Sequence, residues 1–288
     1  MNKPKRRKNP IFNLAFVAAL LVWGTMGSYA EALRSTVLTD WSRRTLLIRI
    51  ELDTREAKIA LPSGRLDAER LIEQSLPGLV KDAVFSLRVD SYRKVGDSLV
   101  DGTLDVNEVL DLALEARRLD AAFSKDLRYF IASYEFPMLA ASGLYLRHSK
   151  PILLKAPLAF QASKPYTGIV IYAKGSLPVH GEGKEGRLEP CLYPRIFDSD
   201  MNLVLDRNIV APEALRRWGP VGYSRGLGIE ADARVGETPI RIMAKALFGT
   251  ARTDLVISRD DALKILALSE NRALLTEGRI YIVADLEP

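Results

Sequence analysis

The chain has 288 residues, of which 48% are hydrophobic and 27% are charged, a balance typical of globular proteins and not of disordered ones. It carries 41 Lys and Arg against 36 Asp and Glu, but five of the bases lie in Lys3–Lys8, where no acid occurs. From Glu31 onward the two signs balance at 36 each, so the positive net charge is no evidence for nucleic-acid binding.

The first thirty residues have the three parts of a secretory signal. The basic start is followed by the uncharged run Asn9–Ala30, whose apolar centre is Leu14–Val22 and whose end is the small-residue pattern Ser28–Ala30. The sequence predicts a signal peptide over residues 1–30, cleaved after Ala30 or Ala32. The alternative is an uncleaved anchor, because about twenty uncharged residues nearly suffice to span a bilayer. In both cases the basic flank stays inside and the rest of the chain lies outside the cytoplasm. Membrane contact is expected only if the segment is uncleaved, and then only through residues 11–30.

A first α+β domain is expected over residues 44–150. The apolar alternation predicts a strand at Leu46–Leu52, and helical spacing from Leu66 to Leu76 predicts a helix that Pro77 ends. The remaining expected elements are a strand at Phe85–Val89, a helix opened by a capping box of Asp105 and Glu108 and running to Ala116, a strand at Leu127–Tyr134 and a helix at Met138–Leu146.

The proline-rich stretch Lys150–Pro165 is the predicted boundary to a second α+β domain, over residues 166–288. Its predicted strands are Tyr166–Ala173, Leu188–Phe197, Leu203–Leu205, Ile240–Leu247, Leu255–Ile257 and Arg279–Leu286, and its predicted helices are Glu213–Trp218 and one capped by Ser258 and Asp261. Because strands and helices mix without strict alternation, the sequence favours the α+β class over a doubly wound parallel sheet.

The sequence contains the letters of three motifs known from catalytic or ligand-binding sites. Each lacks the flanking secondary structure or the further residues that such a site requires. Gly222–Gly226 spells G-x-S-x-G, yet glycines and a proline flank it and no histidine follows it in the chain. Gly181–Gly186 spells G-x-G-x-x-G, but Arg187 to Pro190 cannot open the helix that a dinucleotide site needs, so we expect an exposed hairpin loop. Asp198–Asn202 resembles the start of a calcium loop without its later ligands, and an Asx-type turn explains it more simply.

The metal-ligating residue types are equally sparse. Cys191 is the only cysteine, so it cannot form an internal disulfide, and it lies far from the export signal, which excludes a lipidated cysteine at the cleavage site. We expect it to be a small buried side chain. His180, Glu182 and Cys191 could in principle meet on zinc, but no paired ligand motif supports this site. The sequence therefore predicts no enzyme, no cofactor and no metal.

Two runs resemble a pattern of bacterial envelope proteins: Tyr166–Gly175 (YTGIVIYAKG) and Pro190–Asp198 (PCLYPRIFD). They are similar to exported proteins related to FlgP- and FlgT-type flagellar accessory factors, most like the spirochaete members, whose periplasmic motors carry a large collar. The resemblance implies an assembly component and carries over no catalytic residue. Its motif positions are Gly168, Gly175, Pro190, Pro194, Arg195 and Asp198, which we expect to be structural or to contact a partner. Arg195 in particular is expected to face a carboxylate or a partner.

Two functions from different classes follow. The leading hypothesis is a non-enzymatic periplasmic scaffold of the cell envelope, needed for motility at the flagellar motor, with other envelope or motor proteins, or further copies of itself, as partners. The alternative is a periplasmic module that binds a small ligand or cell-wall glycan, its site shaped by the His180–Gly186 loop and Tyr193.

Overall fold

The computed structural model describes residues 32–159, 161–226 and 233–286, which form two compact units. Within the described residues, the first unit comprises 32–36, 49–76 and 118–134, and the second comprises 37–48, 77–117 and 135–286. The expected export signal, residues 1–30, lies outside the described residues. In the part of the chain that the structure describes, no helix has the length and apolar character needed to cross a membrane.

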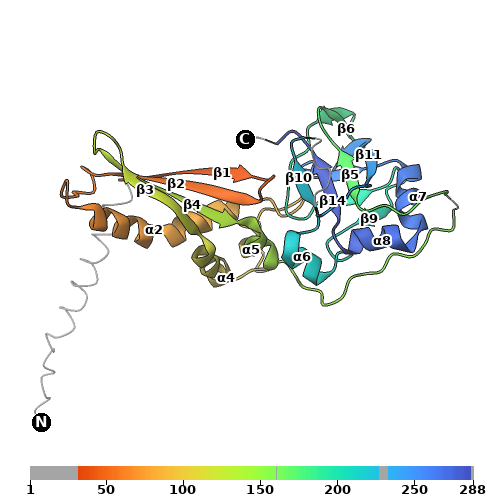
Figure 1. Cartoon of the computed structure of the whole chain (residues 1–288), viewed down its shortest axis with the longest axis horizontal. Coiled ribbons are helices and arrows are strands. Elements are labelled where there is room, and N and C mark those ends of the chain that lie inside the picture. The colour runs from red at the N-terminus through yellow and green to blue at the C-terminus, as the bar shows by residue number, and fades with distance from the viewer. Residues whose placement is uncertain (1–31, 160, 227–232, 287–288) are drawn as a thin grey trace, which may run out of the picture. The chain divides into compact units, whose positions relative to one another are not determined.

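A four-stranded sheet contains the N-terminal strands in the order β1-β2-β4-β3 (Figure 1). The strands are β1 (Leu33–Asp40), β2 (Thr45–Asp53), β3 (Arg117–Phe123) and β4 (Tyr129–Pro137). The predicted strand at Leu46–Leu52 is confirmed, and the one at Leu127–Tyr134 is confirmed with a shift of two or three residues. Both are inner strands with alternate residues buried, the pattern that makes them visible in sequence.

Helix α2 (Arg65–Ser86) corrects two predictions at once. Pro77 lies inside this helix and does not end it, and Phe85 and Ser86 form its last turn, so the strand expected at Phe85–Val89 is wrong. Val80, Ala83 and Val84 continue the helical spacing of buried residues beyond Pro77. Their burial offsets the hydrogen bond that proline removes, a defect worth roughly 3 kcal/mol in a helix interior.

Three short helical segments and a 3₁₀ turn complete the N-terminal half: α3 (Asp97–Val100), α4 (Val106–Asp111), η1 (Leu112–Glu115) and α5 (Met138–Gly143). The capping box is confirmed, because the Asp105 carboxylate accepts from Asn107 N–H at 2.7 Å and Asp105 N–H donates to Glu108 Oε2 at 2.9 Å. The predicted helix tightens into η1 after Asp111 and ends at Glu115. The described residues between Leu144 and Gly168 form neither helix nor strand.

A parallel four-stranded sheet lies at the centre of the second unit, in the order β10-β14-β5-β11. Its strands are β5 (Ile169–Tyr172), β10 (Gly222–Ser224), β11 (Ile240–Met243) and β14 (Ile280–Val283). Ile169, Ile171 and Ile282 are fully buried, as expected for core positions. The near-continuous apolar runs of β5 and β14 suit strands covered on both faces.

A six-stranded mixed sheet has the order β7-β6-β12-β13-β8-β9. Its strands are β6 (Leu177–Val179), β7 (Lys184–Gly186), β8 (Ile196–Phe197), β9 (Leu203–Leu205), β12 (Ala246–Phe248) and β13 (Asp254–Val256). Antiparallel pairing of β6 with β7 makes the Gly-rich loop the turn of a hairpin, as predicted. The expected strand at Leu188–Phe197 is reduced to β8, because Pro190 and Pro194 lack the N–H that a ladder requires. One parallel and one mixed sheet with helices confirm the α+β class.

Two of the three C-terminal helices were predicted from their end signals, and the third, Ser269–Thr276, was not. The three helices are α6 (Pro212–Trp218), α7 (Arg259–Ala267) and α8 (Ser269–Thr276). Ser258 Oγ accepts from Asp261 N–H at 3.1 Å, and Gly219 closes α6 with a φ of 73°. Buried Arg234 donates to Trp218 O and Gly219 O, both at 2.7 Å, and to Gly278 O at 2.8 Å. Its charge therefore lies at the C-terminal ends of α6 and α8, where helix dipoles favour a cation.

Candidate functional site

The segment Pro190–Asp198 contains most of the residues singled out by the sequence, and it is an irregular crossing within the second unit. Leu192 N–H donates to Arg88 O and Tyr193 N–H to Val89 O, both at 2.9 Å. These bonds tie the segment to the chain after α2. Pro190 is partly exposed, whereas Pro194 is buried.

Arg195 faces a carboxylate, one of the two partners that the sequence predicted for it. Its Nε and Nη2 donate to Asp254 Oδ2 at 2.9 and 2.6 Å, and its backbone N–H donates to Oδ1 at 3.0 Å. Burial raises the pKa of the Asp254 carboxyl, and the hydrogen bonds and charge of Arg195 oppose that rise. No local signal could have revealed Asp254, because it lies 59 positions away and reaches Arg195 through the parallel pairing of β13 with β8.

Two aromatic rings flank the same guanidinium. The Arg195 Cζ lies 5.4 Å from the Tyr92 ring centroid and 5.3 Å from that of Phe197. Both distances are within the range of cation–π attraction. Two nitrogens of the Arg195 guanidinium are therefore hydrogen-bonded within the protein and two aromatic rings lie close to it, so this residue stabilises the fold.

Asp198 also makes internal contacts. Its Oδ1 accepts from Asp200 N–H at 2.9 Å and from Asn202 N–H at 2.8 Å, while Oδ2 accepts from the Asn202 side chain. Asp200 is paired with Arg259. The predicted local turn is confirmed, and these contacts account for the Asp and Asn residues without a bound ion.

The two glycines of the first matched run have clear backbone roles. A side chain at Gly168 would collide with the backbone of Val235, so glycine permits a close approach of two chain segments. Gly175 turns the chain after β5 with a φ of 80°, and its N–H donates to Asp285 Oδ2 at 2.7 Å. Lys174 Nζ lies 3.9 Å from Asp285 Oδ1 and donates to Arg225 O at 2.9 Å. These polar groups at the carboxyl end of the parallel sheet bind one another.

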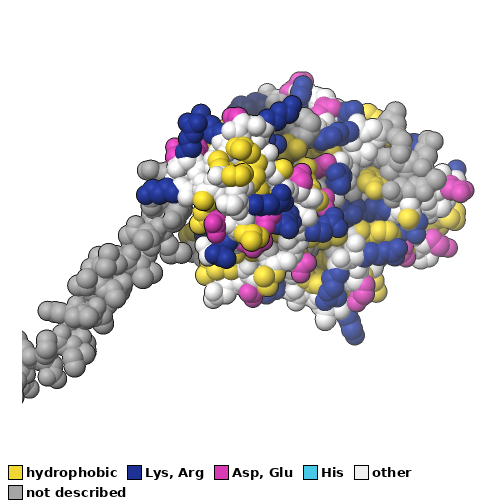
Figure 2. Space-filling view, turned by 60° about the vertical axis from the view of Figure 1, so that its left-hand side comes forward, with side chains coloured by type: hydrophobic (Ala, Val, Ile, Leu, Met, Phe, Trp, Pro, Cys, Tyr) yellow, Lys and Arg dark blue, Asp and Glu magenta, His cyan; other side chains and the backbone are white. Residues whose placement is uncertain are grey.

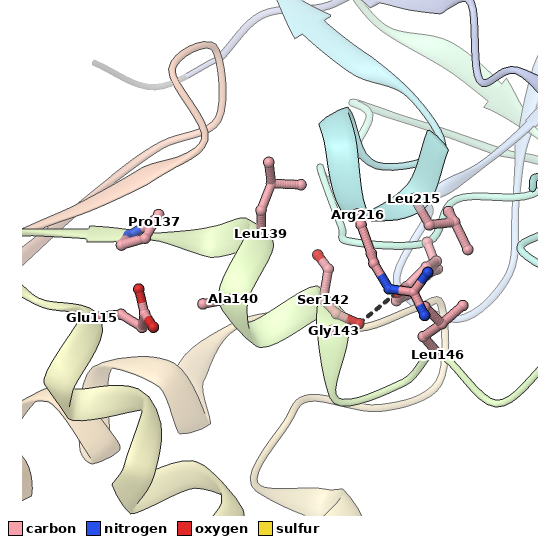
Figure 3. Close-up of a pocket in the computed structure, with 10 residues that line it drawn as sticks. Glu115, Pro137, Leu139, Ala140, Ser142, Gly143, Leu146, Leu215 and Arg216 are labelled. Atoms are coloured by element: carbon pink, nitrogen blue, oxygen red, sulfur yellow. Dashed lines mark hydrogen bonds between the residues drawn. The ribbon is translucent and has the colours of Figure 1, made fainter. Parts of the chain in front are cut away.

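A cavity of about 320 Å³ lies beside α5 and α6 (Figure 3). Its lining is mainly small or apolar, with Glu115 and Arg216 at opposite ends of the residues drawn in Figure 3. Tyr193 O–H donates to Ser142 O at 2.7 Å, and burial raises the pKa of that phenol. The lining includes Tyr193 but no residue of the His180–Gly186 loop, so this cavity contains only one of the two parts that the alternative hypothesis named.

The remaining motif matches have structural explanations too. Ser224 ends β10, and its hydroxyl donates to Gly226 O at 3.0 Å. Buried Cys191 has its backbone N–H and C=O bonded to the Tyr223 hydroxyl, and burial raises the pKa of its thiol. Among the described residues, no group of three or more His, Cys, Asp or Glu side chains is placed to hold a metal ion.

Comparison with protein families identifies both halves of the chain. A family model for the N-terminal domain of Treponema pallidum Tp0624 matches residues 32–144, and a model for the second domain of that protein matches residues 168–286. The chain belongs to this spirochaete-type family. The two matched ranges follow one another along the chain in the order of the Tp0624 domains, separated by the proline-rich stretch. A search among curated proteins finds no match.

Proposed function

We propose that this chain is a non-enzymatic, exported scaffold of the spirochaete envelope that binds other proteins in the periplasm, at the flagellar motor. The observation that carries the proposal is the exposure of both edge strands of the sheet β1-β2-β4-β3. Five successive residues of β1, Arg34–Leu38, are exposed, and so are four of β3, Arg117–Asp120. Edge strands present unpaired N–H and C=O groups along one side, which pair readily with a strand of another chain.

The surface chemistry supports a protein partner. Figure 2 shows basic, acidic and hydrophobic side chains interspersed on the face in view. A mixed surface of this kind suits contacts with proteins better than a single-sign field would, and the balanced charge after residue 30 agrees with it.

The contacts that the segment carrying the family resemblance makes within the protein support the same function. Arg195 and Asp198 make their contacts within the protein, so the segment that carries the resemblance maintains the fold on which an interaction surface is built. The resemblance to FlgP- and FlgT-type factors favours the flagellar motor as the place of assembly, and the family matches agree with a spirochaete-type protein.

Photocrosslinking in cells tests the scaffold role. Benzoylphenylalanine placed at Val37 in β1 or at Leu119 in β3 should capture discrete envelope proteins, identified by mass spectrometry. The matched control is Leu66, which is also exposed but lies in helix α2 and not on a sheet edge. Equal capture at all three positions, or no capture at the two edges, contradicts the scaffold role.

Imaging of motors in situ tests the flagellar assignment separately. A deletion strain should lose motor-associated periplasmic density and swim poorly, and the chain supplied in trans should restore both. Intact motors and normal swimming in the deletion strain contradict the flagellar assignment while leaving the scaffold role to the crosslinks.

A further inference from the structure

A groove of about 490 Å³ runs beside the end of β1, within the second unit. One part of its lining is Val37–Thr39 of β1, and other parts come from the end of α2 and from the segment after β7. Three of its side chains are basic: Arg88, Lys94 and Arg187. We call these three residues and Val37–Thr39 the basic groove.

On the side of the groove formed by β1, the edge of that strand is available to pair with another strand. Val37 and Leu38 are 38% and 45% exposed, although both side chains are apolar. Among the described residues β1 is the edge of its sheet, so the backbone groups on its outer side have no strand partner. An extended peptide that pairs with β1 would satisfy these groups and cover both side chains.

The charges of the groove indicate the chemistry of that peptide. Within the described residues, the side chains of Arg88, Lys94 and Arg187 have neither an ion pair nor a hydrogen bond. Of the two acids in the lining, Asp285 is engaged by Gly175 and Lys174, which leaves Glu189 as the acid without such a contact there. The lining thus has three basic side chains without a paired acid and one acidic side chain without a paired base. This net positive charge favours an anionic occupant.

We propose that the basic groove binds an extended, carboxylate-rich segment of a partner protein, which adds as a strand to β1. The inference rests on the proposed scaffold function and names the class of segment that the scaffold holds. Main-chain bonds to β1 supply sequence-independent affinity, and the three bases select acidic side chains.

The probe is a fluorescein-labelled decapeptide of alternating Glu and Val, with a Lys and Val decapeptide as its charge-reversed control. Anisotropy titrations of the purified protein should show saturable binding of the acidic peptide, weakened by added salt, and none of the basic one. The variant Arg88→Gln, Lys94→Gln, Arg187→Gln should raise the Kd at least tenfold. The matched control, Arg55→Gln, Lys58→Gln, Lys125→Gln, removes the same charge from exposed positions elsewhere and should leave the Kd within twofold.

A proline pair tests the strand addition itself. Successive N–H groups of a strand point to opposite sides, so one of Leu38→Pro and Thr39→Pro removes a donor to β2 and the other removes a donor facing the groove. One of the two variants should therefore keep the thermal stability of the parent and still lose peptide binding.

Several results would overturn the inference: no acidic-peptide binding up to about 1 mM, equal binding of both peptides, an equal loss in both glutamine variants, or retained binding in every stable proline variant. The test of the groove and the test of the motor assignment can fail separately. A deletion strain with normal motors contradicts the motor assignment whether or not the groove binds the probe.

Discussion

Removing the guanidinium of Arg195 should destabilise the second unit more than any surface charge change. The Asp254 side chain is 0% exposed and that of Arg195 is 27% exposed, so Arg195→Met leaves a buried carboxylate without its counter-charge. Breaking a buried pair in this way costs about 3–5 kcal/mol. Part of Arg195 is solvated, so we expect about 3 kcal/mol, a large share of the ~5–15 kcal/mol usual for a domain.

The loss should depend on pH with a definite sign. Burial holds the pKa of the Asp254 carboxyl above its ordinary value, and without Arg195 it rises further. The folded variant then retains a proton that the unfolded chain releases, so stability falls as the pH rises from the ordinary Asp pKa through the folded one. The deficit of Arg195→Met against the parent should therefore be largest at neutral pH and shrink as the pH falls toward about 4.

Urea unfolding followed by tryptophan fluorescence measures this loss, because Trp41 and Trp218 both lie in the second unit with the ion pair. The surface pair of Arg259 and Asp200 provides the control, since both side chains are about half exposed. Arg259→Met should cost less than about 1 kcal/mol.

The double variant Arg195→Met, Asp254→Asn should recover most of the stability, because neither charge remains buried alone and the amide oxygen can still accept from the backbone N–H of residue 195. A cost for Arg195→Met no larger than that for Arg259→Met would refute the reasoning. So would a deficit that grows on acidification.

Four further outcomes are expected. Ile171→Ala, at a fully buried position of β5, should lose about 2–5 kcal/mol in the same unfolding assay and lower the amount of protein in cells. Because burial raises the pKa of the Cys191 thiol, a disulfide reagent should label it only at the rate of unfolding, and rapid labelling of the native protein would contradict that burial. Ser224→Ala should leave motility unchanged, and labelling of Ser224 by a fluorophosphonate would revive a hydrolase. Mature protein from the envelope should begin at Glu31 or Leu33, whereas full-length protein resisting carbonate extraction would indicate an anchor.

The elements that could be predicted from the sequence are those whose local pattern matches their burial. β2 and β5 carry apolar runs at strand spacing, and the caps at Asp105 and Ser258 make the hydrogen bonds that their spacing implies. β1 and β3 were not predicted because an edge strand exposed on most of its residues has no apolar alternation to detect.

The prediction that Pro77 ends its helix failed for the opposite reason. Here a strong local signal is outweighed by tertiary contacts. Proline normally ends a helix, but α2 buries Ile72 before it and Val80 after it. Apolar burial contributes ~1.5–3 kcal/mol for each large side chain, which is comparable to the proline defect. Whether a helix continues through a proline thus depends on which residues pack against the helix before and after the proline. The local sequence does not reveal those residues.

The matched segment Pro190–Asp198 has a different lesson for function. Its signal is specific because the segment is built from residues with few substitutes: prolines without donors, an Arg195 whose Nε and Nη2 donate to one carboxylate oxygen, and an Asp198 that closes a turn. Those residues make their contacts inside the protein, so the segment is informative about the fold and not about the partner that the fold binds. The residues of the basic groove are single charges in loops or at element ends, and no spacing rule marks them before the fold brings them together. Variants of Arg195 should therefore change how much folded protein a cell contains, whereas variants of Arg88, Lys94 and Arg187 should change what the folded protein holds.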